Sequence, residues 1–300
     1  MEKTSFYIEK FNSAVDIIRY YDKIESFETK YQKIDIIKNS NNKNFECMFI
    51  NNGFQSSMED EFFYHEAIVH PAMFAHQNPK DVLIIGGGAG TTLREVLKHP
   101  VDSITMIDLD KEFVDWCREN KKEWHLGSLN NSKVNFIFAD ALQEIKKINK
   151  KFDIIIIDLV TILDQELFGD ENVNSTIDLY SENFYSDCKM AFKSKESILV
   201  TQAHGLTKSD ESYKRHFYIH KQLKKVFNIV KDYSVYIESW CYNNSFIICS
   251  DTVDASKNDI LRTKDIEEIQ NRFKIYDIDF HKHMFYLNRL QQQLLLENSN

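Results

Sequence analysis

Short runs of apolar residues recur through the middle of the chain and are separated by longer stretches with helical periodicity. These runs span residues 82–85, 104–107, 134–138, 154–157 and 198–200. Strands that helices cover on both faces are buried on both sides, so they carry continuous rather than alternating apolar residues. The pattern therefore predicts an α/β fold built on a mainly parallel sheet.

The first part of the chain has a different pattern. Residues 32–37 and 45–50 alternate between apolar and polar side chains, and the polar stretch 38–44 between them is typical of a hairpin loop. Such alternation indicates an antiparallel sheet with one solvated face. We therefore expect a small N-terminal antiparallel β-strand domain over residues 1–55 and a larger α/β domain over residues 56–300.

The last third of the chain predicts additions to the main sheet. Residues 210–227 have the pattern of a helix, and the aromatic-rich segments 229–237 and 245–249 have the pattern of strands. We expect these two strands to form an antiparallel edge of the same sheet. Residues 263–296 predict a helical tail, whose Leu- and Gln-rich end we expect to pack on a partner subunit.

The charge balance narrows the choice of partner. The chain carries 37 Lys and Arg against 46 Asp and Glu, a formal net charge of −9. Because proteins bind nucleic acids largely by neutralising phosphates with Lys and Arg, this balance argues against a nucleic-acid partner. A cationic small molecule fits it better.

Neither metal binding nor membrane association is expected. The five cysteines form no CxxC pair. Six histidines show no metal-ligand pattern in the sequence: His70, His76, His99, His204, His216 and His220. The N-terminus lacks the pattern of a signal peptide, and no apolar run reaches the roughly 18 residues that cross a bilayer. We therefore predict a cytoplasmic protein without a metal site.

The first candidate site is the glycine-rich loop after the first apolar run. Gly86 and Gly88 stand between this predicted strand and a helical segment, and Asp108 follows at the end of the next run. In Rossmann-like sheets a carboxylate about 20 residues beyond such a loop binds the ribose hydroxyls. A glycine run can also be a plain turn, but this context predicts a Rossmann-like nucleoside-binding domain.

Two further acids end the next apolar runs. Asp140 follows the third run and is a candidate to accept a hydrogen bond from an adenine amino group. Asp158 ends the fourth run, at the edge of the sheet where open α/β folds bind ligands. A carboxylate there can hold an incoming ammonium group and accept its proton before attack, so Asp158 is the candidate general base.

Three segments resemble successive signatures of the polyamine aminopropyltransferases, the family of spermidine and thermospermine synthases. They are residues 58–66 (Met-Glu-Asp-Glu-Phe-Phe-Tyr-His-Glu), the loop region 82–96, and residues 179–185 (Leu-Tyr-Ser-Glu-Asn-Phe-Tyr). The resemblance covers roughly residues 25–251. Glu123-Trp124-His125 is similar to the branch that contains thermospermine synthases and agmatine aminopropyltransferases.

The resemblance implies both a fold and an activity. Members of this family have an N-terminal β-sheet ahead of a methyltransferase-type domain, and they transfer the aminopropyl group of decarboxylated S-adenosylmethionine to an amine. The resemblance also implies a small-molecule amine substrate and a homodimer or homotetramer.

By position, the resemblance assigns roles to individual residues. Those expected to bind the donor are Gln55, His65, Gly86, Gly88, Asp108 and Asp140. Asp158 and Tyr64 are the expected catalytic residues, and Tyr64, Gln202 and Tyr236 are expected to bind the amine. Trp240 is expected to pack rather than to contact a substrate.

Two departures from the family pattern leave the donor open. Ala89 replaces the acidic residue that faces the donor's amino group, and residues 158–162 lack the second acid and the proline of the family's Asp-x-x-Asp-Pro segment. Asp164, Glu166 and Asp170 are candidates to substitute for that acid. Losing one partner of a buried ion pair costs about 3–5 kcal/mol. The affinity for the usual donor, decarboxylated S-adenosylmethionine, is therefore lowered unless another acid compensates.

Three hypotheses follow from these departures. The first is aminopropyl transfer from decarboxylated S-adenosylmethionine to a polyamine or related amine. The second uses intact S-adenosylmethionine for methyl or 3-amino-3-carboxypropyl transfer to a specialised amine or heterocycle. The third is a non-catalytic protein that binds a nucleoside or polyamine.

Overall fold

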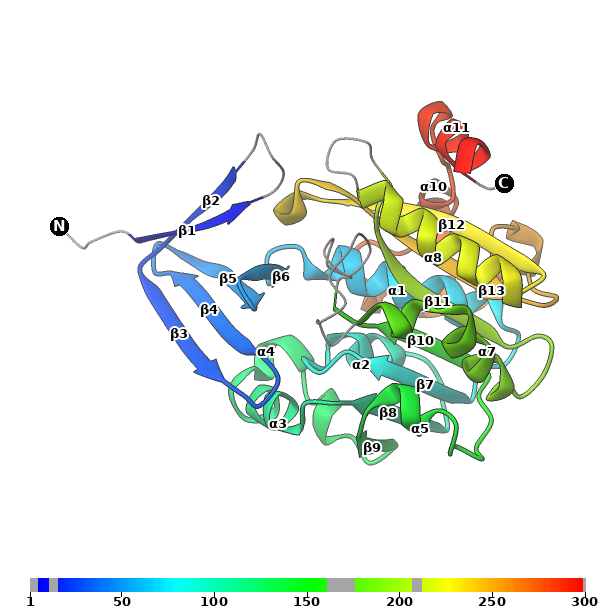
Figure 1. Cartoon of the computed structure of the whole chain (residues 1–300), viewed down its shortest axis with the longest axis horizontal. Helices are drawn as coiled ribbons and strands as arrows, with labels where there is room; N and C mark the ends of the chain where they lie inside the picture. Colours follow the sequence, from blue (N-terminus) through cyan, green and yellow to red (C-terminus); the bar gives the residue numbers. More distant parts are fainter. Residues whose placement is uncertain (1–4, 11–15, 161–175, 207–211, 299–300) are drawn as a thin grey trace.

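A seven-stranded sheet forms the centre of the molecule (Figure 1). The structure is a computed structural model that describes residues 5–10, 16–160, 176–206 and 212–298. The strand order is β12-β13-β11-β10-β7-β8-β9, and only the pairings that involve β12 and β13 are antiparallel. The strands are β7 (Asp81–Gly86), β8 (Ser103–Asp108), β9 (Val134–Phe138), β10 (Ile154–Asp158), β11 (Ile198–Gly205), β12 (Ile229–Ile237) and β13 (Tyr242–Ser250).

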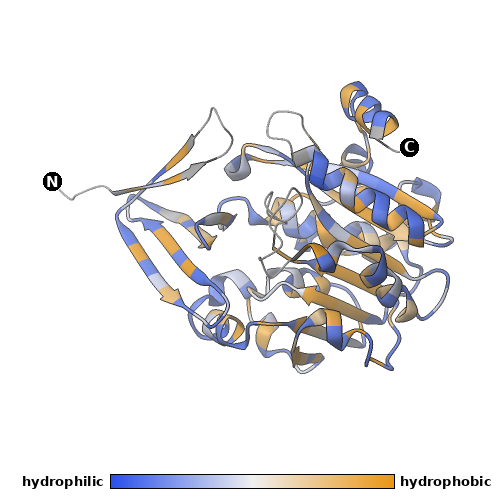
Figure 2. Ribbon diagram, viewed as in Figure 1, coloured by the Kyte–Doolittle hydropathy of each residue, from blue (hydrophilic) through white to orange (hydrophobic). Residues whose placement is uncertain are grey.

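Helices cover both faces of this sheet, which explains the continuous apolar runs. One face packs against α1 (Glu61–Ala75), α2 (Thr91–Val96) and α3 (Lys111–Asn120), and the other against α5 (Ala141–Glu144), α7 (Glu182–Met190) and α8 (Ser212–Val226) (Figure 1). In β10, Ile154 and Ile156 belong to the first core, whereas Ile155 and Ile157 belong to the second. Figure 2 shows this apolar centre as mainly orange strands. The predicted α/β fold with its antiparallel edge is confirmed.

The N-terminal region forms two small antiparallel sheets. Strands β3 (Lys23–Glu28), β4 (Lys33–Asn39), β5 (Asn42–Ile50) and β6 (Gly53–Ser57) make one, and β1 (Ser5–Lys10) pairs with β2 (Asp16–Tyr21) in a hairpin that projects from it (Figure 1). In Figure 2 the strands of the four-stranded sheet alternate between orange and blue. The division of the chain at residue 55 stays a prediction.

The predicted hairpin over residues 38–44 is present, but its turn is shorter than predicted. Strand β4 continues to Asn39 and β5 begins at Asn42, so that only a tight turn separates them. The Asp22 carboxylate accepts hydrogen bonds from the Ser40 N–H at 2.9 and 3.1 Å, which anchors the turn to the neighbouring strand β3. Pairing along the sheet thus overrides the low strand propensity of these polar residues.

The predicted helical tail is interrupted. It consists of α9 (Thr263–Ile269), α10 (Ile278–Met284) and α11 (Arg289–Asn298), separated by short segments, the first of which begins with a 3₁₀ turn (Gln270–Arg272). The buried Glu66 carboxylate holds the segment between α9 and α10, because it accepts the backbone N–H groups of Lys274, Ile275 and Tyr276 at 2.7, 3.0 and 2.9 Å. Asp277 then caps α10 by accepting the Phe280 N–H at 2.7 Å.

The terminal helix α11 packs within the chain on one side only. Leu294 is 1% exposed and contacts Leu206 and Phe217, while Leu290 and Leu296 are 53% and 74% exposed. The β1–β2 hairpin likewise presents exposed apolar side chains, among them Phe6 and Tyr20. Contact with a partner subunit stays a prediction.

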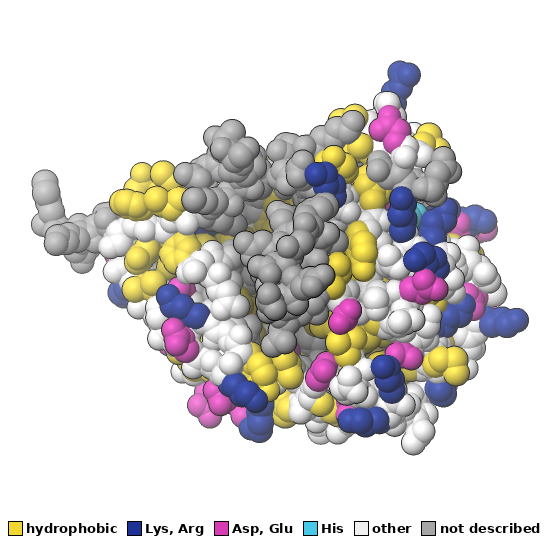
Figure 3. Space-filling view, viewed as in Figure 1, with side chains coloured by type: hydrophobic (Ala, Val, Ile, Leu, Met, Phe, Trp, Pro, Cys, Tyr) yellow, Lys and Arg dark blue, Asp and Glu magenta, His cyan; other side chains and the backbone are white. Residues whose placement is uncertain are grey.

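The surface carries charges of both signs. Lys and Arg side chains are interspersed with Asp and Glu on the face shown in Figure 3, and they form no large patch of one sign there. Within the described ranges, no helix is both long enough and apolar enough to cross a membrane. Cytoplasmic location stays a prediction.

We expect Glu66→Ala to lower the free energy of unfolding by about 3 kcal/mol, because the buried N–H group of Tyr276 and the part-buried N–H groups of Lys274 and Ile275 would lose their acceptor. Urea denaturation followed by circular dichroism would measure this change. The exposed Glu267 on α9 provides the matched control, and Glu267→Ala should stay within about 0.5 kcal/mol of the wild type. Equal stability of the two variants would contradict the anchoring role of Glu66.

Candidate active site

A cavity lies at the carboxyl edge of the central sheet, where β7 and β10 are neighbours. The chain continues from β7 toward β8 on one side and from β10 toward β11 on the other, so this is the point where open α/β sheets bind ligands. The central sheet and the N-terminal sheet both line the cavity. Lining residues include Gly86, Gly88, Ala89, Asp108, Asp140 and Asp158 from the former and Met48, Ile50, Gln55 and Ser56 from the latter.

The glycine loop is shaped by close approach to two acids. Gly86 has a φ of +83°, and a Cβ atom there would lie 2.2 Å from the carbonyl oxygen of Asp158. A Cβ atom on Gly88 would lie 2.9 Å from Oδ2 of Asp108. The Gly87 N–H also donates to the Asp158 carbonyl oxygen at 2.9 Å. Glycine is therefore required at 86, where the clash is with backbone, whereas a side chain at 88 would displace the side chains of Phe113 and Asp108.

The Asp158 carboxylate is oriented by two hydroxyl groups. The Tyr64 hydroxyl, on α1, donates a hydrogen bond to Oδ1 at a distance of 2.8 Å. The Thr92 hydroxyl, in the first turn of α2, donates a hydrogen bond to Oδ2 at a distance of 2.5 Å. Burial raises the pKa of Tyr64 well above its usual value, and the neighbouring Asp158 raises it further, so the phenol stays protonated. Since each carboxylate oxygen has two lone pairs, both oxygens retain one for a substrate.

Asp108 is placed at the end of β8 in an unusual electrostatic environment. Burial raises the pKa of its carboxyl group to about 7, and the charges of Asp110 and Asp158 act in the same direction. The Asp110 N–H donates to Oδ1 at 2.8 Å, which partly opposes the shift. Hydroxyl groups of a ligand that donate to this carboxylate would therefore stabilise its ionised form.

Asp110 ties the N-terminal sheet to this edge of the cavity. Its Oδ2 accepts the Thr29 hydroxyl at 2.5 Å and the Gln32 amide at 2.9 Å, both from the turn between β3 and β4. A second link joins the Trp124 indole N–H to Oε1 of Glu46 on β5, at 2.7 Å. These bonds hold the N-terminal sheet as a wall of the cavity.

His65 lies at the cavity edge and joins α1 to the glycine loop. Its Nδ1 lies 2.7 Å from Oε2 of Glu61, and its Nε2 lies 2.7 Å from the Thr91 hydroxyl. Both carboxylate oxygens of Glu61 also accept hydrogen bonds from Nη2 of Arg94, Oε1 at 3.0 Å and Oε2 at 2.9 Å. Burial alone would raise the pKa of Glu61, but the hydrogen bond from His65 and the nearby positive charges lower it to about 2. The structure thus supports a positioning role for His65.

The remaining predicted donor residues also reach the cavity. Asp140 lines it and accepts the Leu142 N–H at 2.9 Å as the N-cap of α5. Gln55 lines it from β6, and Ala89 lines it within the glycine loop. Asp164, Glu166 and Asp170 lie outside the described residues.

Two of the three predicted amine-site residues lie at the cavity. Tyr64 and Gln202 line it, and the Gln202 amide is held by donation to the Tyr180 hydroxyl at 2.7 Å. Tyr236 does not reach it: this side chain is 55% exposed and lines a separate depression with Phe280 and other residues. Side chains alternate along β12, and the buried neighbours of Tyr236 in sequence face the core.

Trp240 does more than the expected packing. Its ring packs against Phe54, with centroids 5.6 Å apart, and it also lines the cavity. There it lies nearly parallel to the ring of Tyr64, with an interplanar angle of 7° and centroids 6.4 Å apart. The two aromatic rings form one side of the cavity close to Asp158.

Comparison with known proteins agrees with this architecture. The family described as "Spermine/spermidine synthase domain" matches residues 61–259. The chain is 36% identical over 249 residues to "Polyamine aminopropyltransferase 2" of Hyperthermus butylicus, covering 81% of this chain and 77% of the relative. The chain belongs to the spermine/spermidine synthase family. It is therefore related to enzymes that transfer aminopropyl groups, as predicted.

Two further relatives extend the comparison. The family member "Thermospermine synthase ACAULIS5" of Arabidopsis thaliana is 33% identical over 227 residues, covering 74% of this chain and 62% of the relative. The crystal structure of a spermidine synthase from Thermotoga maritima has a TM-score of 0.84 at 24% identity, covering 98% and 96% of the two chains. This likeness confirms the fold.

Several site residues of this family member escaped the sequence analysis. The sequence contained a signal for Thr92, because this hydroxyl residue stands in the first turn of the helix that follows the glycine loop. Asp110 also had one, since an aspartate just before a helix is a common N-cap. Their contacts with Asp158 and with Thr29 join segments far apart in the chain, so no local pattern could reveal them.

We expect methylthioadenosine, as a nucleoside probe, to bind more weakly as the pH falls below about 7. Ligand hydroxyls favour ionised Asp108, whose pKa without ligand is about 7, so affinity is full above that pH and falls by up to about tenfold per unit below it. Isothermal titration between about pH 8 and about pH 5.5 would test this. Asp108→Asn should bind weakly with a flat pH profile, and a flat profile in the wild type would contradict the assignment.

Proposed function

We propose that this protein transfers the aminopropyl group of decarboxylated S-adenosylmethionine to a polyamine or related amine, with Asp158 as the general base. The observation that carries the proposal is the Asp158 carboxylate, which Tyr64 and Thr92 orient beside the glycine loop. Relatives named polyamine aminopropyltransferase support the choice of reaction.

The proposed step is a direct displacement. The amine nitrogen attacks the propyl carbon attached to the sulfonium, and a carbon–nitrogen bond forms as the carbon–sulfur bond breaks. The electron pair of that bond goes to sulfur, which leaves as the neutral thioether methylthioadenosine. The proton that the amine must lose passes to Asp158, whose spare lone pairs also hold the incoming ammonium group.

The donor would lie across the carboxyl ends of β7, β8 and β9. Asp108 is suited to accept the two ribose hydroxyls, and Asp140 to accept the adenine amino group. The backbone of Gly86 and Gly88 leaves room for the ligand beside these acids because neither residue has a side chain.

The amine would lie between the donor and the pair of aromatic rings. Tyr64 and Trp240 offer parallel faces that suit an aliphatic chain carrying positive charges, since aromatic faces attract cations. Gln202, whose amide is fixed by Tyr180, adds a polar group at the same end of the cavity. Positioning of the two reactants is the main source of rate in such a displacement.

One observation favours the second hypothesis, that intact S-adenosylmethionine is the donor. Ala89 lines the cavity where the family pattern has an acid, so the carboxylate of an intact donor would meet no repulsion from this residue. The acceptor would then be a specialised amine or heterocycle, and the group transferred a methyl or 3-amino-3-carboxypropyl group.

We expect Asp158→Asn to lower kcat for methylthioadenosine release by about 10²–10⁴-fold, because the amide cannot accept the proton of the amine. The Kd for methylthioadenosine should change only a few fold, since the base faces the amine. Asp259→Asn, at an exposed aspartate of the C-terminal region, is the matched control and should leave kcat unchanged. Wild-type turnover by Asp158→Asn would contradict the proposed base.

Isothermal titration with each donor should separate the two hypotheses. Under the leading proposal, the wild type binds decarboxylated S-adenosylmethionine at least about tenfold more tightly, or about 1.4 kcal/mol. Ala89→Asp should strengthen binding of the decarboxylated donor further and weaken binding of the intact one, because the new carboxylate attracts the ammonium and repels the carboxylate. Tighter binding of the intact donor by the wild type would favour the second hypothesis. Methylthioadenosine formation with any amine would exclude a non-catalytic protein.

A further inference from the structure

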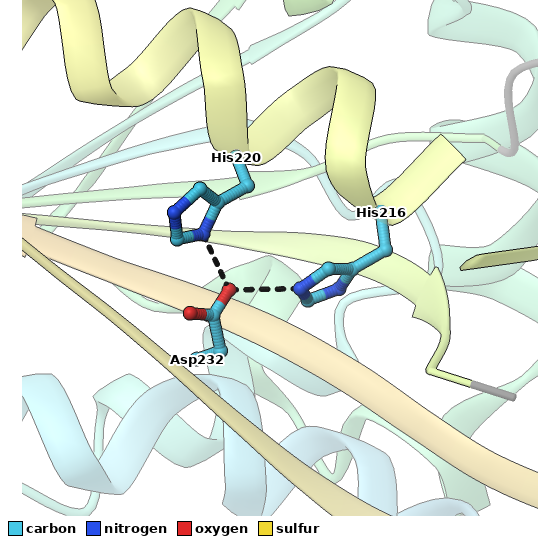
Figure 4. Close-up of side chains that lie close together, drawn as sticks. All are labelled: His216, His220 and Asp232. Atoms are coloured by element: carbon cyan, nitrogen blue, oxygen red, sulfur yellow. Dashed lines mark hydrogen bonds and ion pairs between the residues drawn. The ribbon is translucent and has the colours of Figure 1, made fainter. Parts of the chain in front are cut away.

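Two histidines and an aspartate meet between α8 and β12, apart from the residues that line the cavity (Figure 4). His216 and His220 are one turn apart on α8, and both point toward Asp232 on β12. Nε2 of His216 and Nδ1 of His220 each lie 2.8 Å from the same oxygen, Oδ1 of Asp232. The side chains of the three residues are at most 7% exposed.

The hydrogen bonds around His216 determine which ring nitrogen carries a proton. The Ser245 hydroxyl lies within hydrogen-bond distance of the carbonyl oxygens of Ala203 and His204, which can only accept. Ser245 uses its single proton for one of them. Nδ1 of His216, 2.8 Å from the same hydroxyl oxygen, must therefore donate to Ser245.

This arrangement leaves Nε2 of a neutral His216 with a lone pair directed at a carboxylate. A lone pair on Nε2 and a lone pair on the carboxylate oxygen repel each other at the 2.8 Å that separates the two atoms. Either a proton or a metal cation must therefore lie between them.

We propose that His216, His220 and Asp232 form a binding site for a zinc-type divalent cation. Imidazole nitrogen and carboxylate oxygen are ligands that Zn²⁺ binds at about 2.0–2.2 Å. The three donor atoms lie within 4.8 Å of one another, so one ion can reach all three after small side-chain shifts. Two histidines four residues apart on a helix are a common metal-binding pair because both side chains lie on one face.

The surroundings of His216 match those of a metal ligand. A histidine that binds metal through one nitrogen usually donates the other N–H to an oxygen, which fixes the ring. Here Nδ1 of His216 donates to Ser245, and Ser245 is itself held by the backbone at the end of β11. Ser245 is therefore a positioning residue for the site.

A second buried cluster in the described part of the chain lacks this character. Glu66, His70 and Glu95 also lie close together, but Lys98 pairs with Glu95 and three backbone N–H groups occupy Glu66. Positive charge and donors are already supplied there by the protein. The need for an added cation is specific to the cluster around Asp232.

The proposed ion would join α8 to the edge of the central sheet. Helix α8 packs on β11, the strand that delivers Gln202 to the cavity. The proposal departs from the sequence-based prediction of no metal site, and the four-residue spacing of His216 and His220 is the sequence feature that favours it. The inference does not depend on the proposed reaction, because none of the three ligands lines the cavity.

The test is metal titration of the full-length, tag-free protein after treatment with a chelator. We expect one equivalent of Zn²⁺ to bind and to raise Tm, and Co²⁺ to give the visible absorption of a site with nitrogen and oxygen ligands. His220→Gln should weaken Zn²⁺ binding by at least about tenfold and remove the Co²⁺ spectrum. Ser245→Ala should weaken it by about 10–100-fold.

The exposed His283 on α10 provides the matched control, and His283→Gln should bind both ions as the wild type does. The wild-type Co²⁺ spectrum tests the proposal even where a variant fails to fold. Absence of that spectrum, or Zn²⁺ binding that His220→Gln leaves unchanged, would overturn the proposal and place a proton, rather than a metal ion, between His216 and Asp232. A thiolate-to-cobalt band would also overturn it, because the ligands would then include a cysteine such as the exposed Cys241.

Discussion

The parallel pairing of β7 with β10 is the constraint on which the site depends. In this register Gly86 stands opposite Asp158, and the following Gly87 N–H bonds to the Asp158 carbonyl oxygen. The backbone of the glycine loop therefore passes directly over the end of β10, at a distance that no side chain at position 86 would allow. Any shift of this pairing would separate the glycine loop from the carboxylate that we propose acts on the amine.

Helices α1 and α2 orient the Asp158 carboxylate that the strand pairing places beside the glycine loop. Each contributes one hydroxyl to Asp158, and the bond network of His65, Glu61 and Arg94 holds the two helices together. The proposed general base is thus positioned by part-buried polar contacts whose partners are all supplied within the chain. Such networks are stable when every member is satisfied, and they limit the orientations that the side chains can adopt.

The N-terminal sheet adds a wall to the cavity at the edge of the central sheet. The Asp110 carboxylate accepts hydrogen bonds from the side chains of Thr29 and Gln32, in the turn between β3 and β4 of that sheet. Asp110 lies two residues after Asp108, which is suited to bind ribose. The same short segment of chain therefore provides a predicted ligand contact and the joint between two parts of the molecule. Burial is also the main reason that the pKa of Asp108 is raised to about 7, which is why we expect binding at this site to depend on pH near neutrality.

The sequence by itself determined the α/β fold, the strands of the central sheet, the glycine loop and the acids that end the strands. These features are local: apolar runs, glycines and strand-end carboxylates lie in short segments, and their physical meaning does not depend on distant residues. Tertiary structure alone decided that Thr92 holds Asp158, that Trp240 faces the cavity while Tyr236 does not, and that Asp232 joins His216. Each of these outcomes depends on which segments pack together and on which face of a strand a side chain lies, and sequence patterns do not record either.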